Sequence, residues 1–309
     1  MRKTCLNMVY ELAKSDPRVV FIGSDLGSGT LDNFKKEMPE RFFMEGISEA
    51  NIVGVASGLA MEGKIPYVNT IASFITRRAF EQVLLDVCLH NLNVRLIGNG
   101  GGLVYAPLGP THMTIEDIAI MRSIPNMTIV APADENEMKQ FMLKTVDYSG
   151  PIYIRLAKGY DPIVTKYDQP FEIAKAVVMT EGKDAVVFST GITLKIALEC
   201  AENLLKQGIE LSIIHLPTIK PLDDSIINLI EKVPLIVTIE EHSIIGGIGS
   251  CLGEIIAESN LSGSKIFKRI GITDSFPDEY GSQSSLMEKY SITNKNLESI
   301  ILNNIKRKS

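Results

Sequence analysis

Two absences narrow what this chain can be. No stretch of its 309 residues approaches the ~18 consecutive apolar residues that a membrane-spanning helix needs, so nothing predicts a membrane protein. The formal net charge is −6, and no basic stripe with interleaved aromatic residues is present. Nucleic-acid-binding domains usually carry such a stripe, so we expect no nucleic-acid partner.

Cysteine is also scarce. The chain has four, which are far apart and form no CxxC pair: Cys5, Cys88, Cys200 and Cys251. We interpret them as small buried residues in a reducing compartment, rather than as disulfides or metal ligands. The first residues, MRKTCLNMVYELAKSDP, are too polar for a signal peptide. We therefore expect a cytoplasmic protein.

Several catalytic motifs are missing as well. Neither GxxxxGK[ST] nor GxSxG occurs, and no two of the four histidines stand at metal-ligand spacing, so we expect no metal site on this chain. The glycine-dense segment 98–112 fails as a GxGxxG motif because Leu103 occupies the third glycine position. A glycine loop at the end of a strand still suits the active site of an α/β protein, and this one leads to His112.

Short β-branched runs alternate with helical patterns along the chain, which indicates parallel sheets covered by helices on both faces. Strands are predicted at 19–23, 65–69, 94–98, 127–132, 152–156, 185–190, 211–216, 235–241 and 265–272. Helices are predicted at 3–14, 49–62, 74–91, 114–123, 134–147, 193–207, 222–232 and 246–259. We expect two tandem three-layer α/β domains, 1–160 and 173–309, joined by a linker at 161–172.

The stretch 45–64, EGISEANIVGVASGLAMEGK, carries the most information. It predicts a helix nearly free of charge, with Ser48 as a possible N-cap and Glu49 in the first turn. A helix that is apolar all round is buried. Glu49 is then either a carboxylate that stabilises the helix end or a group placed to transfer a proton.

Four segments together resemble the C-terminal half of a transketolase. They are FFMEGISEANIVGVASGLAMEGK, NTIASFITRRAFEQV, GPTHMTIEDIAIMRSIPNMTIVAPAD and EEHSIIGGIGS, which occur in the family's order and spacing over nearly the whole chain. The resemblance implies a pyrimidine-binding domain followed by a transketolase C-terminal domain, and thiamine diphosphate as cofactor. It also implies that the domain holding the diphosphate and its Mg²⁺ or Ca²⁺ lies on a partner chain.

The resemblance assigns roles to residues of the first half. Glu49 matches the glutamate that bonds N1′ of the aminopyrimidine, and Phe74 matches the aromatic residue that stacks on that ring. The remaining positions matched to the cofactor site are Asp25, Leu26, Ile71 and Arg77. His112 matches a histidine that contacts the sugar substrate, and Lys158 matches a phosphate-binding arginine.

Arg155 lies close to Lys158 at the end of a predicted strand, where the pair could bind a phosphate or simply be solvated. Two further positions depart from the family pattern. Leu108 replaces an acid that many relatives carry before the GxTH motif, and Gly100 replaces a histidine. Both positions face substrate in the family, so the cofactor chemistry is expected to be intact while the substrate is expected to differ.

The resemblance predicts one subunit of a split transketolase, active only with the partner that carries the diphosphate domain. It would transfer a two-carbon ketol unit from a ketose phosphate to an aldehyde, as a homodimer within an assembly of two chains of each kind. One alternative is the β subunit of a 2-oxo acid dehydrogenase. The other is a catalytically silent scaffold subunit.

Overall fold

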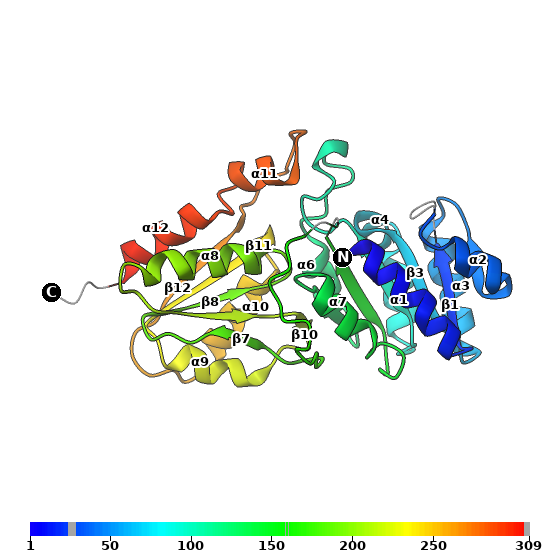
Figure 1. The fold of residues 1–309 in the computed structure, drawn as a ribbon, viewed down its shortest axis with the longest axis horizontal. Helices are drawn as coiled ribbons and strands as arrows, with labels where there is room; N and C mark the ends of the chain where they lie inside the picture. The colour runs from blue at the N-terminus through cyan, green and yellow to red at the C-terminus, as the bar shows by residue number, and fades with distance from the viewer. Residues whose placement is uncertain (24–28, 158, 160, 306–309) are drawn as a thin grey trace.

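The computed structural model describes residues 1–23, 29–157, 159 and 161–305. Within these ranges the chain forms two mostly parallel β-sheets with helices packed on their faces, and the two halves lie side by side along the long axis (Figure 1). The predicted α/β fold class is confirmed. None of the helices in the described ranges is long and apolar enough to cross a membrane.

The first sheet has seven strands. They are β1 (Val19–Gly23), β2 (Phe42–Met44), β3 (Ile65–Ile71), β4 (Arg95–Asn99), β5 (Thr128–Val130), β6 (Ile152–Leu156) and β10 (Thr218–Lys220). Their order is β10-β5-β6-β4-β3-β1-β2, and only the β10–β5 pair is antiparallel. Strand β1 is buried along its whole length, which explains why its sequence VVFIG is a continuous apolar run.

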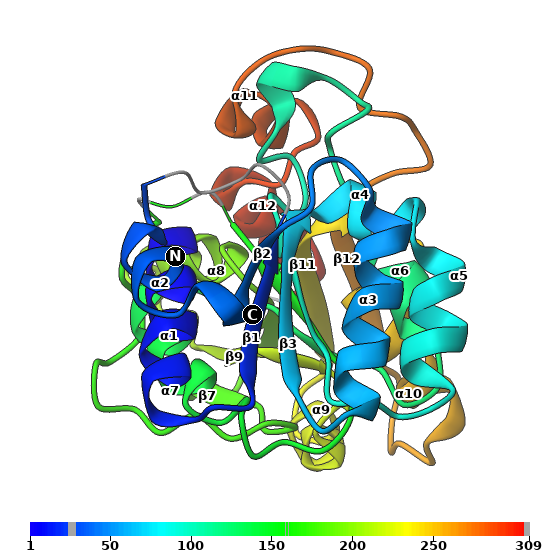
Figure 2. The same ribbon diagram turned by 90° about the vertical axis from the view of Figure 1, so that its right-hand side faces the viewer.

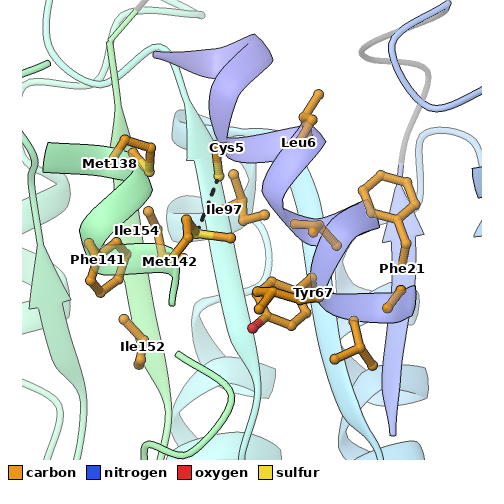
Figure 3. Packing of buried hydrophobic residues seen from close by; sticks show 14 of the residues in the cluster. Cys5, Leu6, Phe21, Tyr67, Ile97, Met138, Phe141, Met142, Ile152 and Ile154 are labelled. Atoms are coloured by element: carbon orange, nitrogen blue, oxygen red, sulfur yellow. Dashed lines mark hydrogen bonds between the residues drawn. The ribbon is translucent and has the colours of Figure 1, made fainter. Parts of the chain in front are cut away.

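Helices cover both faces of this sheet. The helices of the first half are α1 (Arg2–Ser15), α2 (Asp32–Glu37), η1 (Pro39–Arg41), α3 (Glu49–Met61), α4 (Ala72–Arg77), α5 (Phe80–Gln82), η2 (Val83–Cys88), η3 (Ala106–Leu108), α6 (Asp117–Arg122) and α7 (Glu135–Met142). Helices α1, α2 and α7 share one core, and α3, α4, η2 and α6 share the core on the opposite face (Figure 2). In the first core the Cys5 thiol lies 3.8 Å from the Met142 sulfur (Figure 3).

The second sheet has five strands. They are β7 (Val177–Thr180), β8 (Ala185–Ser189), β9 (Leu211–His215), β11 (Leu235–Ser243) and β12 (Ile266–Ile272), in the order β12-β11-β8-β9-β7. Its helices are α8 (Thr193–Leu205), η4 (Asp224–Ile226), α9 (Ile227–Glu231), α10 (Ile248–Glu258), α11 (Gln283–Lys289) and α12 (Asn294–Asn304). Helices α8 and α12 share the core on one face, and α9 and α10 share the core on the other.

The two halves are joined by more than a linker. Strand β10 belongs to the second half of the sequence but pairs with β5 at the edge of the first sheet. Beside it the Ala131 amide donates to the Pro217 carbonyl (2.8 Å), and the Lys220 ammonium donates to the Arg122 carbonyl (2.9 Å). These bonds tie the halves together at one end of the first sheet.

The structure differs from the sequence predictions at several elements. The helix expected at 74–91 is divided into α4, α5 and η2, and the strands β2, β7 and β10 and helices α2, α11 and α12 were not predicted. Three- and four-residue strands have too little length to show a periodic pattern. Helices α11 and α12 did carry a signal, because Ser282 and Thr293 cap their first turns.

Helix α3 was expected to be buried all round, and in the single chain that expectation is wrong. Its core-facing residues include Ile52 and Val53, whereas Val55 is 40% exposed and Met61 is 55% exposed. Ser48 occupies the N-cap position, but its hydroxyl donates to the Glu45 carbonyl instead of accepting from a helix amide. The helix therefore has one buried face and one uncovered apolar face.

Candidate active site

The candidate site lies where the strands of the first sheet end. Ligands of open α/β sheets bind outside the carboxyl ends of the strands. Strand β3 ends at the half-buried Ile71 and runs directly into α4, which carries Phe74 and Arg77. Helix α3, which starts with Glu49, follows strand β2. The loop that holds His112 follows β4.

Glu49 is a buried carboxylate at the entrance of α3. Its side chain is 4% exposed, and its Oε2 accepts a hydrogen bond from Arg78 Nη1 at 3.3 Å. The Arg78 side chain is half exposed, so this contact joins a buried acid to a cation at the surface. A carboxylate can accept several hydrogen bonds, and Arg78 supplies one of them.

Phe74 links Glu49 to the glycine loop. Its ring lies 3.8 Å from the centre of the Arg78 guanidinium and 5.1 Å from the His112 ring, in an edge-to-face arrangement. The structure thus brings Glu49, Phe74 and His112 into one chain of contacts through Arg78. No role for Arg78 was predicted from the sequence.

Arg77 points to a different part of the site. It forms an ion pair with Glu116 and donates from Nη2 to the Met113 carbonyl at 2.7 Å. These bonds fasten α4 to the segment that follows His112. Arg77 and Glu116 also line a cavity of about 670 Å³ between this segment and residues 273–277.

The glycine loop is held in a shape that other residues could not adopt. Gly100 has φ +75°, and a Cβ at this position would lie 2.2 Å from the Tyr105 ring. Tyr105 therefore fills the space beside position 100, and its ring lies 6.5 Å from the His112 ring. A histidine, which the resemblance leads one to expect at position 100, has no room beside Tyr105 in this loop conformation.

Two other loop residues matched to the substrate site are accessible. Leu108 is 49% exposed at the tip of the loop. His112 is half-buried, and its Nδ1 lies 2.8 Å from the Thr111 hydroxyl. Asp25, Leu26 and Lys158 lie outside the described residues.

Arg155 has a different setting from the phosphate site that the sequence suggested. It is 7% exposed, and its Nε donates to Asp117 Oδ2 at 2.7 Å. Its Nη2 donates to the carbonyls of Glu241 (2.9 Å) and Thr114 (3.4 Å). The guanidinium forms a buried ion pair with Asp117 and donates hydrogen bonds to carbonyl groups of both halves of the chain. It is neither solvated nor open to a phosphate.

The Asp117–Arg155 pair belongs to a buried polar network between the halves. Burial alone would raise the pKa of Asp117, but the Arg155 charge and hydrogen bonds from Arg155 and Tyr153 hold it below its usual range. Burial raises the pKa of Glu241 to about 7, although Arg155, Gln283 and the Leu103 amide favour its ionised form.

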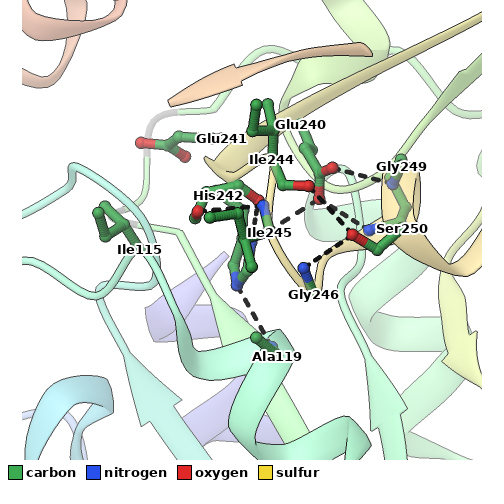
Figure 4. A network of polar contacts seen from close by, with 12 residues as sticks. Ile115, Ala119, Glu240, Glu241, His242, Ile244, Ile245, Gly246, Gly249 and Ser250 are labelled. Atoms are coloured by element: carbon green, nitrogen blue, oxygen red, sulfur yellow. Dashed lines mark hydrogen bonds and ion pairs between the residues drawn. The ribbon is translucent and has the colours of Figure 1, made fainter. Parts of the chain in front are cut away.

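Neighbouring residues of β11 continue this network. The side chain of Glu240 accepts from the amides of Ile248 and Gly249 at the start of α10, which fixes that helix on the strand (Figure 4). His242 is fully buried, and its Nε2 lies 3.4 Å from the Ala119 amide in the first turn of α6. His242 thus contacts the start of α6 from the other half of the chain.

Comparison with known proteins identifies the architecture around this site. Residues 1–160 match the family model for the transketolase pyrimidine binding domain, and residues 174–297 match that for the transketolase C-terminal domain. This chain belongs to the transketolase family. It corresponds to the C-terminal part of a split transketolase-family protein, as the sequence predicted.

Several relatives match this transketolase-family chain over nearly its full length. A putative transketolase C-terminal section of Methanocaldococcus jannaschii is 36% identical, over 99% of this chain and 96% of the relative. The 6-deoxy-6-sulfo-D-fructose transketolase subunit SqwH of a Clostridium species is 35% identical, over 96% and 92%. A 1-deoxy-D-xylulose-5-phosphate synthase of Syntrophus aciditrophicus is 37% identical, but the match covers only 42% of that enzyme.

Solved structures agree with these matches. A split gene transketolase, solved as an inactive beta4 tetramer, has a TM-score of 0.89 and 34% identity, covering 98% of this chain and 97% of that one. A mutant transketolase of Pichia stipitis has a TM-score of 0.77 at 17% identity and covers 98% of this chain, which supports the fold alone. Neither alternative, a 2-oxo acid dehydrogenase subunit or a silent scaffold, is better supported.

The residues present fit the aminopyrimidine end of thiamine diphosphate, the cofactor that the family implies. A buried carboxylate at Glu49 suits a ring nitrogen, and the half-buried Phe74 offers a ring face for stacking. Within the described ranges no group of three or more His, Cys, Asp or Glu residues is arranged to hold a metal ion. The fit therefore concerns the organic ring of the cofactor.

Proposed function

We propose that this chain is a thiamine-diphosphate-dependent transketolase subunit that moves a two-carbon ketol unit from a ketose phosphate to an aldehyde. The observation that supports it most is the buried Glu49 carboxylate, in contact through Arg78 with Phe74 and so with His112. The proposed domains are 1–160 and 173–309, with a linker at 161–172. Thiamine diphosphate supplies the nucleophilic carbon that carries the two-carbon unit.

Glu49 acts on the aminopyrimidine ring in this proposal. At 4% exposure its carboxyl group has little water around it and is free to bond a ring nitrogen beside it. Glu49 would hold a proton at N1′ of the ring and so activate the cofactor by acid–base catalysis. Arg78, whose Nη1 lies 3.3 Å from Glu49 Oε2, would help to hold the carboxyl group in position.

We propose the other cofactor contacts at α4 and at the end of β3. Phe74 would stack on the aminopyrimidine, with Ile71 beside it at the end of β3. Arg77 would act from the edge of the site, since Glu116 and the Met113 carbonyl already bind it. Asp25 and Leu26 remain proposed contacts from the resemblance alone.

His112 and Leu108 would face the substrate. His112 is a proposed catalytic residue, because its ring lies 5.1 Å from that of Phe74, the proposed stacking residue. Leu108 offers no hydrogen bond where many relatives have an acid, so a sugar hydroxyl there would be left without a partner. Lys158 would bind the substrate phosphate as a point charge. We assign Arg155 to the buried network in place of a substrate role.

The proposed assembly pairs this chain with an N-terminal transketolase subunit that holds the diphosphate and its Mg²⁺ or Ca²⁺. A two-plus-two assembly is supported by the exposed face of α3, where Val55 and Met61 lie uncovered in the single chain. Gly58, also exposed, would let a second backbone approach closely. One solved relative is described as a beta4 tetramer, which shows that a similar chain can associate with itself.

Reconstitution tests this proposal. The chain would be mixed with the N-terminal transketolase subunit of the same organism, thiamine diphosphate and Mg²⁺, and assayed for ketol transfer from ketose phosphates to a set of aldehydes. We expect transfer by the mixture and none by this chain alone. Reduction of an artificial acceptor by 2-oxo acids but not by ketose phosphates would instead support the dehydrogenase alternative. Activity of the partner alone, unchanged when this chain is added, would support the scaffold.

A further inference from the structure

The loop that carries Leu108 and His112 is closed at its base like a hairpin. The Gly102 amide donates to the Thr114 carbonyl at 2.8 Å, and the Thr114 amide donates back to the Gly102 carbonyl at 2.9 Å. These two bonds leave residues 103–113 as an arch. The position of His112 therefore depends on what holds the base and the arch in place.

Glu241, from the second half of the chain, holds the base of this arch. It lies near the end of β11, is 3% exposed, and its Oε1 accepts a hydrogen bond from the Leu103 amide at 2.8 Å. The same oxygen accepts from Gln283 Nε2 at 2.8 Å, at the start of α11. One carboxylate oxygen thus joins a strand, the loop and a helix. Figure 4 shows the Glu241 side chain pointing away from the Glu240 contacts with α10.

Steric contacts reinforce the same connection. Gly102 has φ +69°, and a Cβ there would lie 2.5 Å from the Glu241 carboxyl carbon. At the tip of the arch a Cβ on Gly109, which has φ +78°, would lie 2.8 Å from the Tyr280 ring. The loop of the first half is therefore packed against the second half at both its base and its tip.

We propose that Glu241 is a positioning residue, which fixes the arch 103–113 and so sets His112 against Phe74. The proposal rests on the proposed function in one respect, the contact of His112 with substrate. It gives the second half of the chain a direct part in substrate binding. A misplacement of about 1 Å at a reacting group can cost about 100-fold in rate, so the support of this loop matters for catalysis.

Hydrogen exchange of the purified chain tests the structural part without any activity. In Glu241→Ala the Leu103 amide loses its acceptor, so peptides within 102–114 should exchange at least about 10-fold faster than in wild type. Glu241→Gln keeps an oxygen acceptor and should restore slow exchange. The matched control is Glu240→Ala, which should speed exchange only at the start of α10. Equal exchange of 102–114 in wild type and Glu241→Ala would overturn the proposal.

The reconstituted complex tests the functional part. Glu241→Ala should raise the KM for ketose phosphate at least about 10-fold, while exchange of the cofactor C2 proton stays at the wild-type rate because Glu49 is untouched. If Glu241→Ala does not fold, Glu241→Asp replaces it, because aspartate is shorter by one methylene. Glu241→Asp should also raise the KM and leave exchange of the C2 proton unchanged. An unchanged KM in these variants would contradict the positioning role. A wild-type complex without transfer activity would contradict the proposed function. The amide hydrogen exchange of the purified chain would still test how Glu241 holds the loop.

Discussion

Asp117→Asn should destabilise the protein strongly, because it breaks a buried ion pair. Asp117 is fully buried, and its Oδ2 accepts from Arg155 Nε at 2.7 Å and from the Tyr153 hydroxyl at 2.8 Å. Removing one partner of a buried pair leaves the other charge uncompensated, at a cost of about 3–5 kcal/mol. Asparagine keeps one acceptor oxygen, so we expect the lower value, a loss of about 3 kcal/mol in the free energy of unfolding.

Calorimetry and urea unfolding measure this loss. A change of about 3 kcal/mol corresponds to a fall in Tm of roughly 6–12 °C for a domain of this size. The matched control is Glu199→Gln, which breaks the surface pair of Glu199 with Lys195 and should leave Tm unchanged. If the Tm of Asp117→Asn lay within about 1 °C of that of wild type, the buried ion pair would not contribute the estimated energy, and this explanation of its role would be wrong.

The same variant has a predicted pH dependence. The pKa of Asp117 in the folded protein lies below its ordinary value of 3.8. A lowered pKa contributes stability that is present above the unfolded value and is lost as the pH falls through the folded value. The part of the gap in stability that comes from the Asp117 charge should therefore close in acid, as the pH falls below that ordinary value.

Three further predictions follow from the site and the surface. Leu108→Asp should favour aldehydes with a hydroxyl next to the carbonyl by about 5- to 150-fold in kcat/KM, and equal ratios for both proteins would show that position 108 does not read the substrate. Gly100→Ala should lower Tm, because its φ of +75° and the Tyr105 ring exclude a Cβ; an unchanged Tm would contradict the described loop. The chain should self-associate through α3, so light scattering that gives a monomer at micromolar concentration would contradict the proposed interface.

The sequence predicted the long elements well, for a physical reason. Strands such as β1 and β6 are buried on both faces of the sheet. Their sequences are therefore largely continuous apolar runs, which predict strands. Strand β10 could not be predicted, because a strand of three residues is too short to show a periodic pattern in the sequence. The exposed face of α3 was also missed, because an apolar helix surface does not say whether the same chain or another one covers it.

Within the site, sequence motifs predicted which residues take part, but they did not predict the contacts between them. Glu49, Phe74 and His112 were named from the resemblance, and the structure brings them together through Arg78. Glu241 was missed, since a carboxylate in an EEH run gives no sign that it bonds a loop 138 positions away in the chain. Such pairings arise from tertiary packing, which a single sequence does not display.

Arg155 was named as a possible phosphate ligand, whereas the structure places it in a buried ion pair. A cation at the end of a strand is a reasonable phosphate ligand, but the sequence could not show that Asp117 lies within 2.7 Å of it. Gly100 shows what the structure adds to a departure from the family pattern. At this position φ is +75° and a Cβ would meet the Tyr105 ring, so a histidine there would need a different loop conformation.

The central claim is that Glu49 activates the cofactor, and exchange of the cofactor C2 proton tests it most directly. The measurement compares wild type and Glu49→Gln in complex with the N-terminal subunit, thiamine diphosphate and Mg²⁺, following loss of the C2 proton into deuterated water. Glutamine keeps the shape of the side chain but cannot hold the proton at N1′, so the account predicts exchange slower by about 10²–10⁴-fold with the fold intact. Exchange of the Glu49→Gln complex at the wild-type rate would contradict it.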